Sequence, residues 1–254
     1  MPVGPGVVPV VEADLGPGVR AGFTTRSGGV SVPPWDALNL GLEVGDTAAR
    51  VLANRQVVER WVGARVAFAS QVHGTGVRVL SGPPASSATS VGLYDALVST
   101  SPSVAVAVLV ADCVPVLLAD VEAGVVGAVH AGRRGLVAGV VQAAVDALEA
   151  AGAYRDRLRA VVGPSISGAA YEVPAAMRDE VAAALPETWA TTAWGTPALD
   201  LPAGVAAVLA RAGVRDVRTV GICTTTDERF YSHRLAARHG GTTGRFAGVI
   251  RLEG

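Results

Sequence analysis

Apolar residues in this chain fall into short runs that are typical of buried β-strands. The most apolar stretch covers residues 104–119 and is interrupted by Asp112 and Pro115, so it predicts two successive strands. It is also too short and too interrupted to span a bilayer, which takes about 20 apolar residues. The full pattern predicts strands at residues 7–11, 20–24, 66–72, 77–80, 104–110, 114–120, 125–130, 158–162, 217–223 and 246–252.

Helical periodicity occurs in four segments, which cover residues 47–62, 136–151, 174–184 and 202–211. Asp46 is a candidate N-cap for the first helix, and Gly63 and Gly152 follow the ends of the first two. The strands outnumber the helices and cluster without regular strand–helix alternation. The pattern therefore favours an α+β sandwich over a doubly wound sheet. No linker or internal repeat divides the sequence, so residues 1–254 are interpreted as a single domain.

Composition and charge narrow the class of protein further. Half of the 254 residues are hydrophobic, which suits a chain that buries a core. The net charge is −1 from 21 arginines and 22 acidic residues, so the sequence predicts no nucleic-acid partner and no membrane-surface role. Met1–Gly16 carries no basic, apolar export signal, and two cysteines suit a reducing compartment, so we expect a cytoplasmic protein.

Candidate chemistry occurs where predicted strands end. His73 stands in the segment Ser70–Gly76, after an apolar strand and before two glycines, where its imidazole can face an open space; a satisfied core histidine is the alternative. Asp112 and Cys113 interrupt the most apolar region of the chain. A buried Asp112 needs a polar partner, because an unpaired buried carboxylate is costly. Cys113 is either a chemically active thiol or one more small buried side chain.

A third motif, Gly127–Gly135, joins a strand that ends on His130 to a helix expected to begin near Leu136. The free N–H groups of that first turn, together with Arg134, predict an anion site for phosphate or a carboxylate. The alternative is that both arginines of the motif are solvated on a loop.

His73, Cys113 and His130 together offer two imidazoles and one thiolate, separated by 40 and 17 residues. This donor set suits one zinc ion and leaves a fourth tetrahedral position open, as in catalytic rather than structural sites. Copper is not expected, because a multicopper oxidase needs about ten histidine ligands. The whole chain has four histidines.

Further motifs follow one another along the chain. They are Gly22–Val30, Leu38–Gly41, Gly45-Asp46, Asn54-Arg55, Gln71–Gly74, Ala111–Pro115, His130–Gly132, Gly163-Pro164, Tyr171–Val173, Phe230–Arg234 and Thr243–Arg245. In this order they resemble the YfiH-type laccase-domain family. The resemblance implies mixed β-sheets flanked by helices. It also implies metal ligands at His73, Cys113 and His130, the residues already selected from the sequence.

The resemblance further implies a purine nucleoside phosphorylase that acts on adenosine, inosine, guanosine and methylthioadenosine and also deaminates adenosine. Small-molecule nucleosides and phosphate are the expected partners. In one respect the chain departs from the family, which usually has tryptophan where this sequence has Arg133. That exchange leaves the expected ligands untouched and concerns substrate preference.

Phosphorolysis and deamination make different demands on one pocket. Phosphorolysis needs phosphate placed beneath the ribose, and we expect Arg134 and Arg26 to bind it, although Arg26 is equally interpreted as a structural residue of its glycine turn. Deamination needs a metal-activated hydroxide at the purine C6, with a side chain that moves protons. The predicted catalytic residues are Asp112 as the proton carrier, Cys113 and His130.

The other polar motifs receive structural interpretations. Cys223 is expected to be a buried thiol, His233 to shape the rim of the pocket, and Glu172 to pair with an arginine. Two other functions stay open on the sequence alone. Cys113 could act as a nucleophile with His130 or His73 on an amide such as a cell-wall precursor, or zinc could merely stabilise an interaction module.

Overall fold

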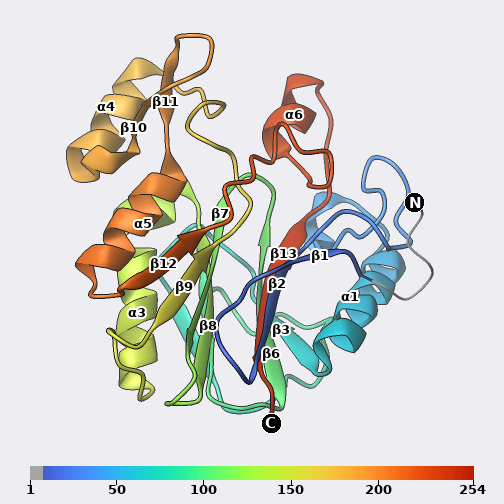
Figure 1. Cartoon of the computed structure of the whole chain (residues 1–254). Helices are drawn as coiled ribbons and strands as arrows, with labels where there is room; N and C mark the ends of the chain where they lie inside the picture. Colours follow the sequence, from blue (N-terminus) through green and yellow to red (C-terminus); the bar gives the residue numbers. More distant parts are fainter. Residues whose placement is uncertain (1–7) are drawn as a thin grey trace.

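Two β-sheets pack face to face and form the centre of the molecule, with helices on both outer sides (Figure 1). The computed structural model describes residues 8–254. The first sheet has the strand order β1-β2-β13-β6-β3 and the second the order β12-β9-β7-β8-β5-β4. Each sheet mixes parallel and antiparallel pairs. The predicted α+β sandwich of mixed sheets flanked by helices is thus confirmed.

The strands are short and most are buried. The five-stranded sheet consists of β1 (Val10–Glu12), β2 (Val19–Thr24), β13 (Phe246–Leu252), β6 (Val104–Val110) and β3 (Arg65–Phe68). The six-stranded sheet consists of β12 (Asp216–Thr219), β9 (Arg159–Val162), β7 (Val114–Asp120), β8 (Val125–Ala131), β5 (Ala96–Ser99) and β4 (Val77–Leu80). A separate hairpin is formed by β10 (Trp189–Thr191) and β11 (Pro197–Leu199).

The helices cover the outer faces of the sheets. They are α1 (Ala48–Val62), α2 (Arg133–Ala138), α3 (Val140–Ala150), α4 (Ala175–Ala184), α5 (Leu201–Arg211) and α6 (His233–Arg238), with short 3-10 turns η1 (Leu42–Val44) and η2 (Pro186–Thr188). α1 packs on the five-stranded sheet, whereas α3 and α5 pack on the six-stranded sheet (Figure 1). None of the helices among residues 8–254 is long and apolar enough to cross a membrane.

The interior strand β6 shows how alternation builds these layers. Val104, Val106 and Val108 belong to the core between the two sheets. Ala105 and Ala107 point the other way, into the core beneath α1. Because both faces of β6 are covered, all of its residues are apolar and buried, and a continuous apolar run predicted the strand.

The strands predicted at 104–110, 114–120 and 246–252 have the predicted boundaries. The strand predicted at 77–80 also matches β4, whereas those predicted at 66–72 and 217–223 are too long, since β3 and β12 end at Phe68 and Thr219. The strand predicted from residue 7 begins at Val10, and residues 1–7 lie outside the described residues. β5, the hairpin and α6 were not predicted, since each is too short to show a clear period.

The helix predicted at residues 136–151 is two helices. α2 begins at Arg133 and ends at Gly139, whose φ of 99° lies in the left-handed region, and α3 follows directly. A glycine adopts that conformation without strain, so the chain turns there instead of continuing. The prediction of a start near Leu136 was wrong by three residues, which places both arginines of the motif inside the first helical turn.

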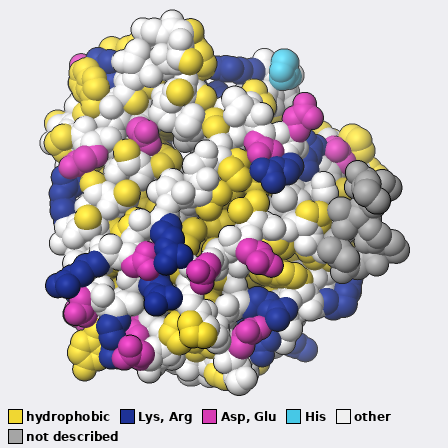
Figure 2. Space-filling view, in the orientation of Figure 1, with side chains coloured by type: hydrophobic (Ala, Val, Ile, Leu, Met, Phe, Trp, Pro, Cys, Tyr) yellow, Lys and Arg dark blue, Asp and Glu magenta, His cyan; other side chains and the backbone are white. Residues whose placement is uncertain are grey.

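Positively and negatively charged side chains are intermixed on the face shown in Figure 2. Basic and acidic groups alternate over that face, with apolar patches between them. This mixed arrangement agrees with the near-zero net charge of the chain.

Candidate metal centre

The candidate site lies at one end of the sandwich, where the chain passes between the two sheets. β3 and β6 are parallel and end there together. β8 ends at the same place, because it is antiparallel to β7, which begins only three residues after β6. His73 follows β3, Cys113 connects β6 to β7, and His130 lies near the end of β8. Residues from both sheets therefore meet at this end.

His130 is directed inward by the alternation of β8. Val126 and Ala128 share its face of the strand and belong to the core between the sheets. Val125 and Val129, on the opposite face, pack toward the helices. His130 is only 3% exposed, so its imidazole occupies the interior of the sandwich end.

His73, Cys113 and His130 each offer one ligand atom, and these atoms all lie within 4.8 Å of one another. Cys113 Sγ is 3.8 Å from His73 Nε2, close to the edge of about 3.5 Å expected between ligands of a tetrahedral zinc site. The two imidazole rings are nearly perpendicular, with centroids 4.8 Å apart. The predicted trio is thus assembled, and its donor set of two nitrogens and one sulfur fits a zinc ion with one open position.

Asp95 holds this trio in place. Its Oδ1 accepts hydrogen bonds from His130 Nδ1 at 2.8 Å and from the backbone N–H of His73 at 2.9 Å. Its Oδ2 accepts from the backbone N–H groups of Val72 and Gly74. Because Nδ1 of His130 is engaged, Nε2 is the ring nitrogen left for a metal, an arrangement typical of histidine ligands.

The charges of the site favour a thiolate. Burial alone would raise the pKa of the Cys113 thiol, but the imidazoles of His130 and His73 outweigh burial and lower this pKa to about 6. Burial would likewise lower the pKa of His130, yet its hydrogen bonds to Asp95 and Cys113 raise it to about 9. The thiolate is the form of cysteine that binds a metal or attacks a carbonyl.

Gly132 leaves room for the ligands. A Cβ on this residue would lie 2.6 Å from His73 Cδ2, closer than real contacts allow, and 3.2 Å from Cys113 Sγ, which is tight. Gly132 is also the N-cap of α2, so the start of the helix is pressed against the metal ligands. This close approach explains why a glycine stands between His130 and the two arginines.

Asp112 has a strained backbone conformation, and both of its carboxylate oxygens accept hydrogen bonds. Its φ of 89° is rare for a residue with a side chain. Its Oδ1 accepts a hydrogen bond from the Thr224 hydroxyl and its Oδ2 one from the backbone N–H of Arg234, both at 2.6 Å. The polar partner that the sequence required is therefore present. The role of Asp112 in proton transfer stays a prediction.

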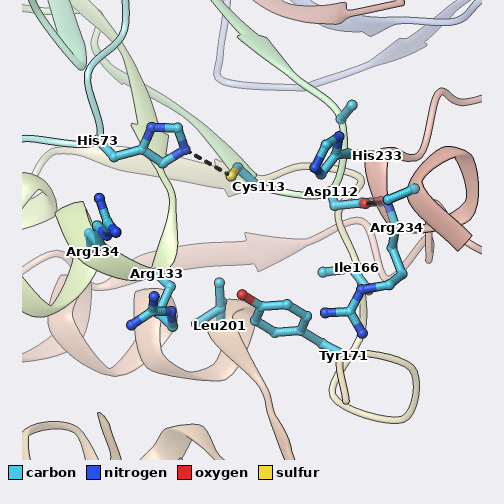
Figure 3. Close-up of a pocket in the computed structure, with 12 residues that line it drawn as sticks. His73, Asp112, Cys113, Arg133, Arg134, Ile166, Tyr171, Leu201, His233 and Arg234 are labelled. Atoms are coloured by element: carbon cyan, nitrogen blue, oxygen red, sulfur yellow. Dashed lines mark hydrogen bonds between the residues drawn. The ribbon is translucent and has the colours of Figure 1, made fainter. Parts of the chain in front are cut away.

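Two neighbouring cavities border the trio, and both are lined by His73 and Cys113. The first, here called the arginine cavity, has a volume of about 510 Å³. Figure 3 shows His73 and Cys113 on one wall, Arg133 and Tyr171 across from them, and Arg134 at the side below His73. The second cavity, of about 600 Å³, is lined by all three candidate ligands and by Phe68, Gln71, Arg55 and Arg245, among others.

Arg26 lies elsewhere. Its guanidinium donates to the backbone carbonyl and the carboxylate of Asp36 and lies 5.1 Å from the Tyr231 ring centroid. Arg26 is absent from the described residues that line the two cavities. These contacts favour the structural interpretation of its glycine turn over the phosphate contact, which stays a prediction.

The remaining predicted residues surround the site. His233 lines both cavities at the start of α6, as expected for a rim residue. Glu172 accepts from Trp194 Nε1 and, through its backbone carbonyl, from Arg234 Nη1, so the arginine meets its carbonyl rather than its carboxylate. Cys223 is partly buried and contacts the hydroxyls of Ser167 and Thr225.

The sequence analysis missed several residues that build the site. Asp95 carried the same signal as Asp112, a carboxylate next to a buried run, but β5 was too short to be recognised. Gln71 pairs with both the N–H and the carbonyl of Leu109 at 2.7 Å and thereby fixes the loop before His73. The sequence marked Tyr171 only as part of the motif Tyr171–Val173.

Comparison with known proteins gives a consistent result. A family model described as "Multi-copper polyphenol oxidoreductase laccase" matches residues 20–253. A purine nucleoside phosphorylase from Streptomyces griseus is 50% identical over 91% of this chain and 93% of its own length. Another from Streptomyces coelicolor is 47% identical over 95% of this chain and 99% of its own length.

Solved structures show the same fold. YlmD from Geobacillus stearothermophilus matches with a TM-score of 0.86 and 32% identity, covering 95% of this chain and 94% of that protein. The hypothetical protein YfiH from Bacillus licheniformis matches with a TM-score of 0.82, 32% identity and 92% coverage of both chains. Sequence motifs, fold and assembled ligand trio agree, and the chain belongs to the YfiH-type laccase-domain family.

Proposed function

We propose that the protein is a zinc-dependent purine nucleoside phosphorylase that also deaminates adenosine. The observation that carries the proposal is the trio of His73, Cys113 and His130, which Asp95 orients and which opens on two cavities. The names of the relatives from Streptomyces, at 47–50% identity, support the same reaction. Adenosine, inosine, guanosine and methylthioadenosine are the proposed nucleosides.

The trio does not suit the oxidase chemistry in the family description. Among residues 8–254 it is the one group of three or more potential ligands found close together. It holds two of the four histidines in the chain. Multicopper oxidation needs several copper centres and about ten histidines. One mononuclear site is therefore proposed, with zinc as its ion.

For phosphorolysis, we assign phosphate to Arg134. This residue lies in the first turn of α2, lines the arginine cavity and is exposed to it. A guanidinium matches phosphate oxygens with two parallel donors, and it can hold the anion where it attacks the ribose as the purine leaves. The adjacent backbone N–H groups of α2 add to the positive potential that attracts phosphate.

For deamination, zinc bound to the trio would supply the Lewis acidity that activates a water molecule for attack at the purine C6. His130 and Cys113 contribute as ligands, with His130 oriented by Asp95. Asp112 lines the arginine cavity beside Cys113 and is the proposed proton carrier. We place the reaction in the cytoplasm, where free Cys113 and Cys223 remain reduced.

One observation favours a second candidate, a cysteine hydrolase. Asp95, His130 and Cys113 form an acid–imidazole–thiol series, and the pKa of Cys113 is lowered to about 6. The same order of groups activates cysteine nucleophiles in amide hydrolysis. Metal content separates the two functions, because a thiolate bound to zinc is not free to attack.

The deciding experiment incubates the zinc-loaded protein with adenosine or inosine, with and without orthophosphate. We expect free base and ribose 1-phosphate only with phosphate, whereas adenosine becomes inosine in either case. Release of free ribose would show a hydrolase instead of a phosphorylase. Full activity on an amide substrate after metal removal would favour the cysteine hydrolase.

A further inference from the structure

Three arginines converge on the arginine cavity and outnumber the one carboxylate that lines it. Arg133, Arg134 and Arg234 all line it. The ion pairs formed among residues 8–254 involve other arginines. Asp112 is the one carboxylate among the described lining residues, and its two oxygens are engaged by Thr224 and by the backbone of Arg234. The cavity is therefore electropositive.

Two of these arginines surround a fixed tyrosine. The guanidinium of Arg234 lies 5.0 Å from the Tyr171 ring centroid, and its Nη1 donates to the carbonyl of Glu172 at 2.9 Å. The backbone of Tyr171 is held through its N–H by Ser167 and through its carbonyl by Leu199. Figure 3 shows the Tyr171 hydroxyl directed into the cavity, on the side of Arg133.

These donors lie apart from the metal ligands. Figure 3 places Arg133 and Tyr171 across the cavity from His73 and Cys113. At about 510 Å³ the cavity is in the range that binds whole small-molecule ligands, far more than one orthophosphate needs. With Arg134 assigned to the phosphate that reacts, the other two arginines and the tyrosine remain without a ligand.

We propose that Arg133, Tyr171 and Arg234 form a second anion subsite, which binds the phosphoryl group of a nucleoside monophosphate. The proposal rests on the proposed function, since it places the nucleoside at the metal trio and the phosphoryl group on the far wall. Two guanidiniums and a hydroxyl provide the charge and the donors that phosphoryl oxygens accept. A neutral nucleoside leaves the repulsion among the three arginines unrelieved.

Arg133 supplies much of the positive charge of this subsite. An apolar ring at this position, such as the tryptophan that the family resemblance implies, would stack on a base or sugar and would repel no cation. An arginine in the first turn of α2 instead adds a permanent charge to the cavity that Arg234 also lines. The charge at this position therefore favours an anionic ligand over a neutral one.

The test measures binding by calorimetry to the zinc-loaded protein at fixed ionic strength, with AMP, adenosine and orthophosphate as separate probes. We expect AMP to bind about tenfold or more tightly than adenosine. Arg133→Met keeps the length of the stem and should remove most of that advantage, with the adenosine affinity unchanged. Tyr171→Phe should remove a smaller part. Arg60→Met, an exposed residue of α1, is the matched control and should change nothing.

Equal affinities for AMP and adenosine in the wild type would overturn the second subsite, and so would an AMP affinity that survives Arg133→Met unchanged. Displacement of AMP by orthophosphate at equal concentration would also overturn it, because a single anion site would then suffice. Failure of the proposed function gives another result, which is distinct from failure of the second subsite. AMP would then bind tightly and with the expected dependence on Arg133, but no nucleoside would be turned over.

Discussion

The two ends of the six-stranded sheet each bury a carboxylate, with opposite consequences. Asp95 precedes β5 at the metal end and is fully buried; Asp120 closes β7 at the other end and is 1% exposed. Each accepts four hydrogen bonds, Asp95 from three backbone N–H groups and His130, and Asp120 from Ala123, Tyr154 and two nitrogens of Arg157. Their burial and bonding are therefore nearly the same.

The difference lies in the side-chain partner. Arg157 is permanently charged and has no atom that could bind a metal ion. Its ion pair with Asp120 therefore only stabilises the fold. His130 has a second ring nitrogen, and its hydrogen bond to Asp95 directs that nitrogen toward Cys113 and His73. A buried carboxylate thus serves function only when its partner can bind something further.

Removal of a ligand should break the metal end completely and leave the other end untouched. We expect Cys113→Ala to lose stoichiometric zinc and to reduce kcat/KM for phosphorolysis and deamination by about a thousandfold, since metal activation contributes several kcal/mol. Metal analysis and steady-state kinetics measure both effects. The matched control is Cys223→Ala, whose thiol contacts Ser167 and Thr225 and should keep its zinc. Full zinc in Cys113→Ala would remove Cys113 from the ligand set.

A gentler change at the same end tests the positioning by Asp95. In Asp95→Asn one oxygen becomes an NH₂ group, which then faces either His130 and the His73 N–H or the N–H groups of Val72 and Gly74. We expect zinc affinity to fall by about 10- to 100-fold, as for other partners of metal-bound histidines. Competition with a chromophoric chelator measures the affinity. An unchanged affinity would show that Asp95 only holds the loop.

The same substitution at the opposite end should affect stability alone. We expect Asp120→Asn to lower the free energy of unfolding at pH 7 by about 2 kcal/mol and to keep full zinc affinity, because Arg157 is partly exposed and retains some hydration. Denaturant titration measures this loss. A loss of zinc in this variant would contradict the separation of the two ends.

The stability that Asp120 contributes depends on pH. Burial favours the neutral form of Asp120, but hydrogen bonds from Tyr154, Ala123 and Arg157 outweigh it and hold its pKa below the ordinary value. A depressed folded pKa contributes stability above the unfolded pKa of about 3.9, and the contribution is lost as pH falls through the folded value. The difference between wild type and Asp120→Asn should therefore shrink below pH 4.

The smallest expected effect concerns phosphate binding by Arg134, at the end of the sheet that holds the candidate metal site. Arg134→Ala should raise the KM for phosphate by about tenfold, the loss of at least one charge-assisted hydrogen bond, with zinc content and stability unchanged. Arg133→Ala is the comparison and should leave the KM for phosphate and for adenosine unchanged, because Arg133 is assigned to the second anion subsite. Kinetics with phosphate varied at fixed nucleoside, and then the reverse, separate the two. An unchanged phosphate KM in Arg134→Ala would remove it from the phosphate site.

Much of the fold was predictable because it depends on local pattern. β6 and β7 are apolar on both faces, so a simple run of valine, alanine and leucine located them with correct ends. The ligand trio was predictable too, since reactive residue types interrupt apolar strands only where something polar meets them. The missed elements, such as β5 and α6, span four and six residues and carry no period to recognise.

The sequence by itself determined the sandwich class and singled out His73, Cys113 and His130 as candidate ligands. Only the tertiary structure decided that Asp95 orients His130 from 35 residues away, that Arg26 turns to Asp36, and that α2 begins beside the ligands. The physical reason is that apolar burial follows a period along the chain, whereas a hydrogen bond or a ligand contact depends on which strands become neighbours. Sheet pairing sets those neighbours, and it joins residues that no local pattern relates.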